Sequence, residues 1–328
     1  MEPLVKALGS AVASEKNIDP FQRDPKFVAQ FLPVIDAINF YYGTKVRGFD
    51  HIPKRGPFMI VGNHSGGATT MDAAFFMSKW FRERGTRAPI YGLAYDLLFS
   101  VPAFASVFRR FGIVPASPAN ARRAVEMGAP VVVFPGGDYE VFRPWTERNK
   151  IRFGHHSGFV KIAIETGIPV VPMTIHGAHQ STLVLTRGHQ IAQLMGIDRL
   201  NVKVFPLIWN IPFGLTPAFV PSLQLPSKVT VEFGAPLQWS HHGRRAAKNP
   251  EVVKQCYDEI TAVMQQTLDR LAEERPYPVL DRMTELRVRR LLRNLQIPGT
   301  PRPKRTTDKT RASRRTSTRS RGTKTSSS

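Results

Sequence analysis

Short, continuously apolar segments that alternate with helix-forming segments restrict the fold of this chain more than any other feature. The clearest is residues 129–134 (Ala-Pro-Val-Val-Val-Phe), and similar runs lie at 58–61 and 168–175. Helical patterns cover about 71–84 and 157–166. Strands that are apolar along their whole length are buried on both faces. The sequence therefore predicts an α/β fold with a single, mainly parallel sheet flanked by helices on both faces.

Composition divides the chain into further segments. Residues 1–43 form an N-terminal segment with one amphipathic helix, and 44–240 hold the alternating strands and helices. Residues 241–297 carry helical patterns that we expect to pack on this domain. Residues 298–328 are rich in Thr, Ser, Lys and Arg and have almost no apolar side chains, so we expect them to be disordered.

The charge balance points to an anionic partner. The formal net charge is +21, of which about +9 lies in residues 298–328. A lipid surface, a phosphate-bearing ligand or nucleic acid would each be attracted. No run of about 20 apolar residues is free of charges and helix breakers, so we expect no transmembrane helix. The lone cysteine, Cys256, excludes an internal disulfide and suits a reducing compartment.

One apolar segment, residues 205–226, is interrupted by five prolines. Proline removes a backbone donor and breaks helices, so this segment cannot be a spanning helix. It either packs over the core or lies against lipid, and the sequence leaves both open. The next apolar run, 229–233, is expected to close the sheet.

A histidine follows the strand predicted at 58–61. The strand stops at Gly62, and a loop with Asn63, His64, Ser65, Gly66 and Gly67 leads to a helix that Thr69 or Thr70 could cap. Imidazole titrates near neutrality, which suits proton transfer. The alternative is a loop histidine that only bonds its surroundings. Loops after parallel strands share one rim, so the Pro135-Gly136-Gly137 loop after the strand at 129–134 should lie near His64.

Four segments in order resemble the sequence blocks of the glycerolipid acyltransferase family. Asn63-His64-Ser65-Gly66-Gly67 with Asp72 resembles the first block, and Gly112-Ile113-Val114-Pro115 the second. Phe134-Pro135-Gly136-Gly137 with Glu140 and Arg143 resembles the third, and Ile168-Pro169-Val170-Val171-Pro172 the fourth. The resemblance covers about residues 45–240 and implies a glycerol-phosphate acyltransferase-like fold.

The chain departs from the family pattern in spacing and in charge. Asp72 lies eight residues after His64 rather than five, so the intervening segment must fold back before the two can bond; otherwise Glu140 is the fallback carboxylate. Gly136 stands where the family commonly has Glu, and Ala116 and Ser117 stand where it has an arginine that holds phosphate. The Pro-Gly-Gly form is similar to the mono- and diacylglycerol acyltransferase branch. Arg143 could partly replace the lost arginines.

The resemblance implies an O-acyltransferase that moves a fatty acyl group from acyl-CoA to a glycerolipid hydroxyl, in phospholipid or neutral lipid biosynthesis. His64 would be the base and Asp72 its partner. Acyl-CoA would be a co-substrate, with no cofactor and no metal; acyl carrier protein is the alternative donor. Substrate contacts are expected from the two loops: Asn63, Ser65, Gly66, Gly67, Pro135, Gly136, Gly137, Glu140 and Arg143. Amides at Gly66-Gly67 or Gly136-Gly137 are candidate oxyanion donors, and Arg143, Arg148, Lys150 and Arg152 candidate ligands for the coenzyme A phosphates.

The expected partners are acyl-CoA, a glycerolipid acceptor such as lysophosphatidic acid, another lysophospholipid or mono- or diacylglycerol, and an anionic membrane surface, with no specific nucleic acid. The expected location is the cytoplasmic face of a membrane, as a peripheral protein. Two alternatives remain open at this point. One is a thioesterase-like hydrolase in which His64 activates water, and the other is a basic lipid- or nucleic-acid-binding protein without chemistry.

Overall fold

The computed structural model describes residues 18–65, 71–99, 102–194, 205–210, 213–218 and 224–294. Contacts group the described residues up to Leu286 into one compact unit, and those from Arg287 onward belong to a second. The predicted disordered segment 298–328 lies outside the described residues.

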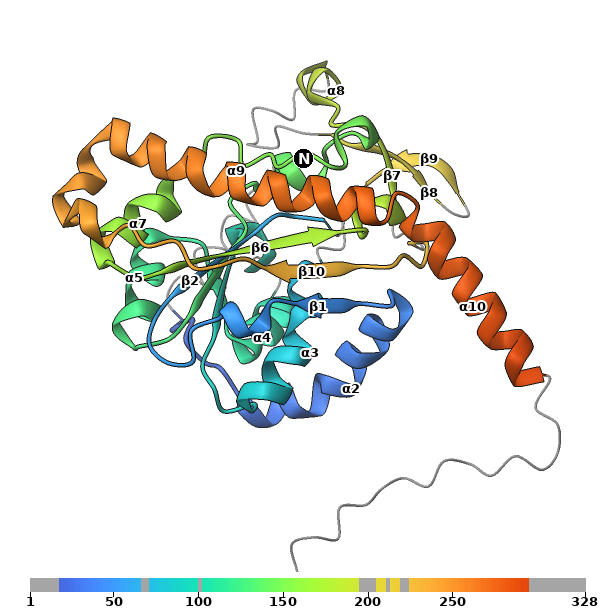
Figure 1. Ribbon diagram of the computed structural model, residues 1–328, viewed down its shortest axis with the longest axis horizontal. Helices are drawn as coiled ribbons and strands as arrows, with labels where there is room; N and C mark the ends of the chain where they lie inside the picture. Colours follow the sequence, from blue (N-terminus) through green and yellow to red (C-terminus); the bar gives the residue numbers. More distant parts are fainter. Residues whose placement is uncertain are drawn as a thin grey trace, which may run out of the picture. The chain divides into compact units, whose positions relative to one another are not determined.

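The main sheet of the described residues has seven strands in the order β1-β10-β6-β2-β5-β3-β4. Figure 1 shows β6, β10 and β1 of this sheet side by side. The strands are β1 Lys45–Arg47, β2 Met59–Gly62, β3 Tyr91–Ala94, β4 Ile113–Pro115, β5 Val131–Val133, β6 Val170–His176 and β10 Thr230–Phe233. From β6 to β4 all neighbours are parallel, whereas β10 runs antiparallel to β6 and β1 parallel to β10. The mainly parallel sheet is therefore confirmed. β10 does not close the sheet at an edge as expected, because β1 pairs outside it.

Helices cover both faces of this sheet. The helices are α2 Pro25–Tyr41, α3 Asp72–Arg84, α4 Pro102–Phe111, α5 Pro118–Glu126, α6 Gly137–Val141, α7 Gly158–Thr166, α8 His189–Leu194, α9 Pro250–Glu274 and α10 Pro278–Asn294. Successive residues of β2 show the layering: Met59 joins the core cluster that contains residues of α5, α7 and α9. Ile60 joins the cluster that contains residues of α2 and α3. The all-apolar strands are thus buried on two sides, which is the physical reason for their composition.

Three helices begin with the same local device. Asp24, Ser117 and Asn249 each occupy the N-cap position, and their side-chain oxygens accept a backbone N–H of the first turn. A proline follows in each case at the start of the helix. Proline fits there because its missing N–H has no partner to lose and its φ angle is already helical. These starts are therefore readable from local sequence.

A second sheet, which the single-sheet prediction did not include, is formed by β7 Leu183–Thr186, β8 Leu207–Asn210 and β9 Gly214–Pro217. Both pairings are antiparallel. Val184, Ile208 and Ala218 form a small buried cluster with Phe142 packed against it. Part of the proline-interrupted segment therefore packs over the domain, and its prolines delimit short strands. Within the described ranges, no helix is both long and apolar enough to cross a bilayer.

At Gly177, just after β6, the backbone passes very close to the segment that leads into β10. Its φ is +101°, and a Cβ there would lie 2.1 Å from the Lys228 carbonyl oxygen. We expect Gly177→Ala to destabilise the fold by about 2 kcal/mol or more, because backbone must move. Gly85→Ala is the control, since Gly85 also has a positive φ but open space around it. Equal losses for both variants in denaturant unfolding would contradict this account.

Candidate active site

His64 lies just beyond the end of β2, and its neighbour fixes the chain there. Asn63 is fully buried, and its amide oxygen accepts the Ile175 N–H at 2.7 Å while its amide nitrogen donates to the Ile175 carbonyl at 3.0 Å. A side-chain amide thus continues the hydrogen-bond ladder between β2 and β6 by one residue. Both polar groups of Asn63 are bonded to backbone inside the core, so we propose a structural role for it in place of the expected substrate contact.

His64 and Asp72 lie in hydrogen-bond contact although they are eight residues apart in the sequence. His64 Nδ1 lies 2.8 Å from Asp72 Oδ2, and the Ser65 N–H donates to the other carboxylate oxygen at 2.8 Å. Asp72 is almost completely buried at the first position of α3. A carboxylate near a helix start is stabilised by the free N–H groups there. Met71 holds the N-cap position, and the expected caps Thr69 and Thr70 lie outside the described residues.

The imidazole has one occupied and one available nitrogen. With Nδ1–H donated to Asp72, the tautomer leaves a lone pair on Nε2. Nε2 has no hydrogen-bond partner among the residues that the structure describes. The ring stacks on Phe134, with centroids 4.8 Å apart and planes at 23°, and 14% of the side chain is exposed. The geometry is that of a base held by a carboxylate and reachable from outside.

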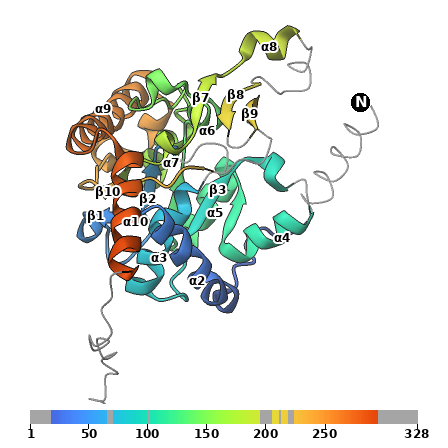
Figure 2. The same cartoon turned by 90° about the vertical axis from the view of Figure 1, so that its right-hand side faces the viewer.

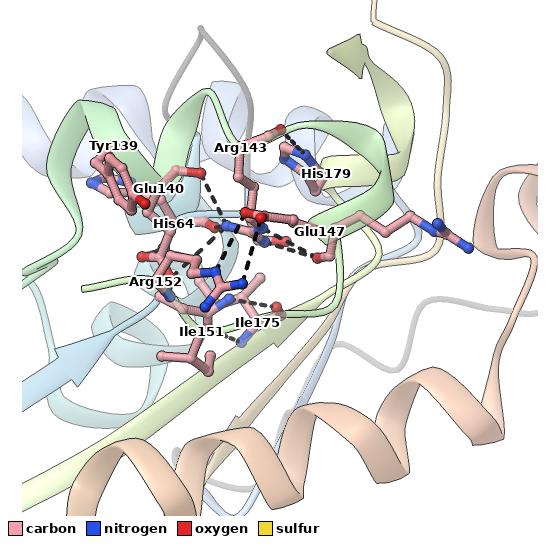
Figure 3. A network of polar contacts seen from close by, with 12 residues as sticks. His64, Tyr139, Glu140, Arg143, Glu147, Ile151, Arg152, Ile175 and His179 are labelled. Carbon is pink, nitrogen blue, oxygen red and sulfur yellow. Dashed lines mark hydrogen bonds and ion pairs between the residues drawn. The ribbon is translucent and has the colours of Figure 1, made fainter. Parts of the chain in front are cut away.

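Two buried charged side chains hold the backbone of His64 (Figure 3). Glu140 Oε2 accepts the His64 N–H at 2.8 Å, and Arg143 Nη1 donates to the His64 carbonyl at 2.6 Å. Glu140 also accepts the Arg152 N–H at 3.0 Å, and Arg143 donates to the Glu140 and Arg148 carbonyls. Both side chains are 0% exposed and lie one helical turn apart, with Nη1 and Oε1 3.9 Å from each other. The peptide of the histidine is therefore fixed on both sides.

Burial is the main influence on the protonation of this pair. It raises the pKa of Glu140, and the positive charge of Arg143 and the two N–H donors act in the opposite direction. Burial likewise lowers the pKa of Arg143, while Glu140 and Asp72 act to raise it. A buried ion pair is tolerated only when further hydrogen bonds satisfy its atoms. The backbone contacts of both side chains supply that satisfaction.

The glycine in the place of the family's glutamate has a steric reason. A Cβ on Gly136 would lie 2.4 Å from the Glu140 Cβ and 2.5 Å from its Oε2. A larger residue at Gly136 would therefore displace the carboxylate that holds His64. Gly137 has a φ of +49°, and open space surrounds its Cα. Its N–H donates to the Phe134 carbonyl at 3.3 Å, so it is a poor candidate for an oxyanion donor.

Several of the predicted substrate-contacting residues are buried or bonded within the protein. Glu140 and Arg143 are buried and bonded to backbone groups, so we propose a structural role for both in place of the expected substrate contacts and of the phosphate-binding role expected for Arg143. Ser65 is also buried, and Pro135 offers its carbonyl to His156 Nδ1 at 3.0 Å. Gly66 and Gly67 lie outside the described residues.

Phe134 was not among the predicted site residues, although it stacks on His64. Its place is made by Gly62, where a Cβ would lie 2.6 Å from the Phe134 ring. The sequence signal is the Gly-Asn-His order in one loop and Phe-Pro-Gly-Gly in the other, but a ring contact between loops is not visible in either. No group of His, Cys, Asp and Glu in the described ranges could hold a metal ion.

A cavity of about 730 Å³ lies elsewhere, between α7, α9 and the turn before α9. Its lining includes Lys161, Lys254 and Tyr257, and none of the residues that surround His64. The cavity therefore lies away from the His64–Asp72 pair, and we assign the candidate active site from this pair.

Comparisons with known proteins agree on one family. A family model described as Acyltransferase matches residues 43–176. A human protein described as a DGAT1/2-independent enzyme synthesizing storage lipids is 29% identical over 133 residues, 40% of each chain. Residues 43–176 thus match the acyltransferase family, in agreement with the resemblance to glycerolipid acyltransferases seen in the sequence. Phytyl ester synthase 2 of Arabidopsis thaliana is 24% identical to this chain over 250 residues, 71% of this chain and 35% of that protein.

Other matches span most of the chain. An uncharacterized protein of Mycobacterium tuberculosis is 28% identical over 268 residues, which is 80% of this chain and 72% of that protein. The crystal structure of the lysophosphatidic acid acyltransferase PlsC from Thermotoga maritima superposes with a TM-score of 0.47 and 18% identity, over 80% of this chain and 87% of that one.

The contacts of Arg143 predict a structural rather than a ligand-binding role. We expect Arg143→Ala to lower the free energy of unfolding by about 3–5 kcal/mol, because it leaves the buried Glu140 carboxylate without its cation. Lys150→Ala, at an exposed position nearby, should change stability by less than about 0.5 kcal/mol. Denaturant unfolding of both variants checks this. A stable Arg143→Ala protein with a raised KM for the acyl donor would instead restore the phosphate-binding role.

Two buried histidines, His176 at the last position of β6 and His179 just beyond it, should lower the free energy of unfolding at acid pH. Burial, aided by Arg275 and Arg148 and opposed by Glu274, lowers the pKa of His176 to about 4. Burial also lowers the pKa of His179, whose Nε2 donates to the Arg143 carbonyl at 3.0 Å. A histidine with a depressed folded pKa stays neutral in the native state while the unfolded chain takes up protons. Stability is therefore present above the unfolded pKa and falls as pH drops below it.

For His176 this loss should amount to about 3 kcal/mol between the unfolded pKa and pH 4. His176→Gln should flatten the decrease of unfolding free energy between pH 7 and pH 4, whereas His241→Gln, at an exposed position, should not. Unfolding curves at several pH values make the comparison. Parallel pH profiles for wild type and His176→Gln would show that His176 does not cause this loss of stability at acid pH.

Proposed function

We propose that this chain transfers a fatty acyl group from acyl-CoA to a hydroxyl of a glycerolipid, with His64 as the general base. The observation that carries the proposal is the imidazole whose Nδ1 is bonded to the buried Asp72 at 2.8 Å while Nε2 is left without a described partner. That arrangement fixes one tautomer and leaves the lone pair of one basic nitrogen available on a partly exposed ring. The match to the acyltransferase family supports acyl transfer as the chemistry that this base serves.

The proposed step balances without an acyl-enzyme. Nε2 of His64 takes the proton of the acceptor hydroxyl while its oxygen attacks the thioester carbonyl. The new C–O bond forms, the tetrahedral intermediate collapses, and the C–S bond breaks. The leaving thiolate takes the proton from the imidazolium, so His64 returns to its neutral form. Asp72 stabilises the imidazolium in between, which is the role of a carboxylate beside a catalytic histidine.

The donor is proposed to be acyl-CoA as a co-substrate, with no resident cofactor. Lys150 and Arg152 are exposed in the segment that follows Arg143 and are candidate ligands for its phosphates. Arg148 has less freedom, since its guanidinium lies over the Trp145 ring at 4.9 Å and donates to the Trp145 carbonyl. An acyl carrier protein would be recognised through the same basic segment.

The acceptor is proposed to be a neutral glyceride, mono- or diacylglycerol, in preference to lysophosphatidic acid. A substrate phosphate needs an available cation near the base. Arg143 of the third block lies against the His64 backbone, but it donates its hydrogen bonds to the His64 and Arg148 carbonyls. Ser117, which stands near the place of the family's phosphate-binding arginine, caps α5 through its hydroxyl. The name of the human relative, an enzyme synthesizing storage lipids, supports the same acceptor class.

The location proposed for this chemistry is the cytoplasmic face of a membrane, because acceptor and product are both lipids. A peripheral attachment is proposed because the formal charge of +21 attracts anionic headgroups. No nucleic acid is required by this function.

Substitutions at the base and its partner test the proposal. We expect His64→Ala to lower kcat by about 10²–10⁴-fold, the usual share of a general base, and also to lower the free energy of unfolding, because it removes one of the two donors to the buried Asp72 carboxylate. Asp72→Asn should also lower kcat, because an amide NH₂ facing Nδ1 favours the wrong tautomer. The assay follows labelled acyl-CoA with lysophosphatidic acid, another lysophospholipid, monoacylglycerol and diacylglycerol as acceptors. His241→Ala is the control, since His241 is exposed and plays no part in the site.

The same assay separates transfer from hydrolysis. Free fatty acid formed equally with and without acceptor would support the thioesterase-like alternative. Full activity of His64→Ala would refute the assigned base, and a strong preference for lysophosphatidic acid would refute the neutral acceptor.

A further inference from the structure

The small sheet exposes a row of large apolar side chains on its outer face. Leu183 pairs with Trp209, and Trp209 pairs with Leu215, so these three lie side by side across β7, β8 and β9. Residues directly opposite on neighbouring strands point to the same face. Trp209 and Leu215 are each 56% exposed, and Phe213, which precedes β9, is 64% exposed. Leu185 adds a further exposed side chain on β7.

The inner face of the same sheet is fixed to the active-site loops. Val184 and Ile208 are buried with Phe142, the residue that ends α6. Arg187, at the end of β7, donates to the Tyr139 carbonyl at 3.1 Å, pairs with Glu147 at 2.9 Å and lies over the Tyr139 ring. The exposed row is therefore the outside of a layer that packs on α6, which carries Glu140 and so holds His64. It is not a loosely attached hairpin.

The segment that forms most of this face contains no charged residue. Residues 205–226 include no Asp, Glu, Lys, Arg or His, although 22% of the chain is Asp, Glu, Lys or Arg. A protein partner in water is usually met by a polar rim around an apolar centre. An uncharged face with tryptophan and phenylalanine is complementary to the boundary between lipid headgroups and acyl chains, where Trp concentrates.

The row lies at the end of the parallel strands where the reaction is placed. Figure 2 looks onto this end and shows β8 and β9 above α4. A second group of exposed apolar side chains follows β3 at the same end: Tyr95, Leu98 in the 3-10 turn Asp96–Phe99, and Phe104 in α4. His64 follows β2 at this end as well. Exposed basic residues, Lys150 and Arg152, follow the 3-10 turn Trp145–Glu147, which contacts β7.

We propose that the outer face of the β7–β9 sheet, formed by Leu185, Trp209, Phe213 and Leu215, inserts into the surface of a lipid bilayer. The choice of lipid as the occupant rests in part on the proposed function, whose acceptor and product reside in membranes. Insertion removes the four apolar side chains from water, and Lys150 and Arg152 then lie where anionic headgroups would be. Because the sheet is fixed to α6, docking brings His64 to the membrane side, and an acceptor need not leave the bilayer.

Vesicle binding of the full-length chain tests the surface separately from activity. The probe is vesicles of phosphatidylcholine with a minor fraction of phosphatidylserine. We expect Phe213→Ser/Leu215→Thr to weaken partitioning into these vesicles by about tenfold or more, as the loss of two buried apolar side chains requires. The matched control is Val34→Thr/Met127→Ser, which removes two equally exposed apolar side chains from α2 and from the end of α5. Circular dichroism and unfolding curves establish that both variants are folded.

The fluorescence of Trp209 reports whether the outer face of the sheet enters the bilayer. Of the four tryptophans, Trp80 and Trp239 are buried and Trp145 is partly buried, so Trp209 is the exposed one. Vesicles should shift the fluorescence of wild type to shorter wavelength, and Trp209→Phe should abolish the shift while keeping the binding. An unshifted spectrum at saturating vesicles would overturn the proposed insertion.

Activity measurements distinguish failure of the surface from failure of the function. Phe213→Ser/Leu215→Thr should keep wild-type turnover of a water-soluble short-chain acyl thioester and acceptor, and lose it only on vesicles. Unchanged vesicle binding in this variant overturns the surface and leaves the acyl transfer intact. A wild-type chain that binds vesicles through these residues but transfers no acyl group refutes the function alone. A concentration-dependent dimer that the double variant abolishes, without vesicle binding, would assign the face to a second copy of the chain and overturn the proposal.

Discussion

The carboxylate of Asp72 is the constraint on which the site depends. Almost fully buried, it needs hydrogen-bond donors, and it receives two from consecutive residues, the His64 imidazole and the Ser65 N–H. An unpaired carboxylate in such a place would cost several kcal/mol. The bonds to Asp72 therefore also fix the positions of His64 and Ser65. The same bond that orients the ring also joins the residues after β2 to the first residue of α3. Acid–base chemistry and local folding therefore rest on one contact.

The Glu140–Arg143 pair adds a second hold on the same histidine, through its backbone. Asp72 sets the ring and its tautomer, whereas Glu140 and Arg143 set the peptide that carries it. Each alone would leave a rotation free: a fixed peptide still allows the side chain to turn, and a fixed ring still allows the loop to shift. Burying two charges is costly, but the opposite charges of the pair compensate each other, and its members bond five backbone groups around the site. The buried pair, although costly, thus fixes the position of the His64 peptide.

Local sequence signals predicted the parts of this molecule that local forces determine. Apolar runs predicted the parallel strands. The capped starts of α2, α5 and α9, where Asp24, Ser117 or Asn249 precedes a proline, are likewise features of local sequence. The meeting of His64 with the Pro-Gly-Gly loop followed from the rule that loops after parallel strands share an edge. The antiparallel insertion of β10 between β1 and β6 had no such signal, because a buried strand is apolar in either direction.

Side-chain roles were harder to predict, because a polar residue in a loop can face a ligand or the protein with the same sequence. Asn63, Glu140 and Arg143 stand in family blocks that surround the chemistry, so a substrate contact was the natural expectation. Asn63 instead bonds Ile175, and Glu140 and Arg143 bond the His64 backbone; these partners are more than 70 residues away and are set by packing that no local pattern records. The second sheet was missed for a related reason. Its strands are short, divided by prolines, and apolar on both sides, so the alternation that marks a half-exposed strand is absent.

Gly136 and Glu140 are best understood as one exchange rather than two unrelated residues. Moving the acidic residue from the turn to α6 places its carboxylate under the His64 N–H, and the vacated position must then be glycine, since a Cβ would lie 2.5 Å from Oε2. The relocated acid needs a buried cation, and Arg143 one turn later supplies it. An arginine used in this way cannot also meet a substrate phosphate. The proposed preference for an uncharged acceptor and the fixed position of the His64 backbone then have a common origin in the Pro-Gly-Gly-x-x-Glu-x-x-Arg pattern.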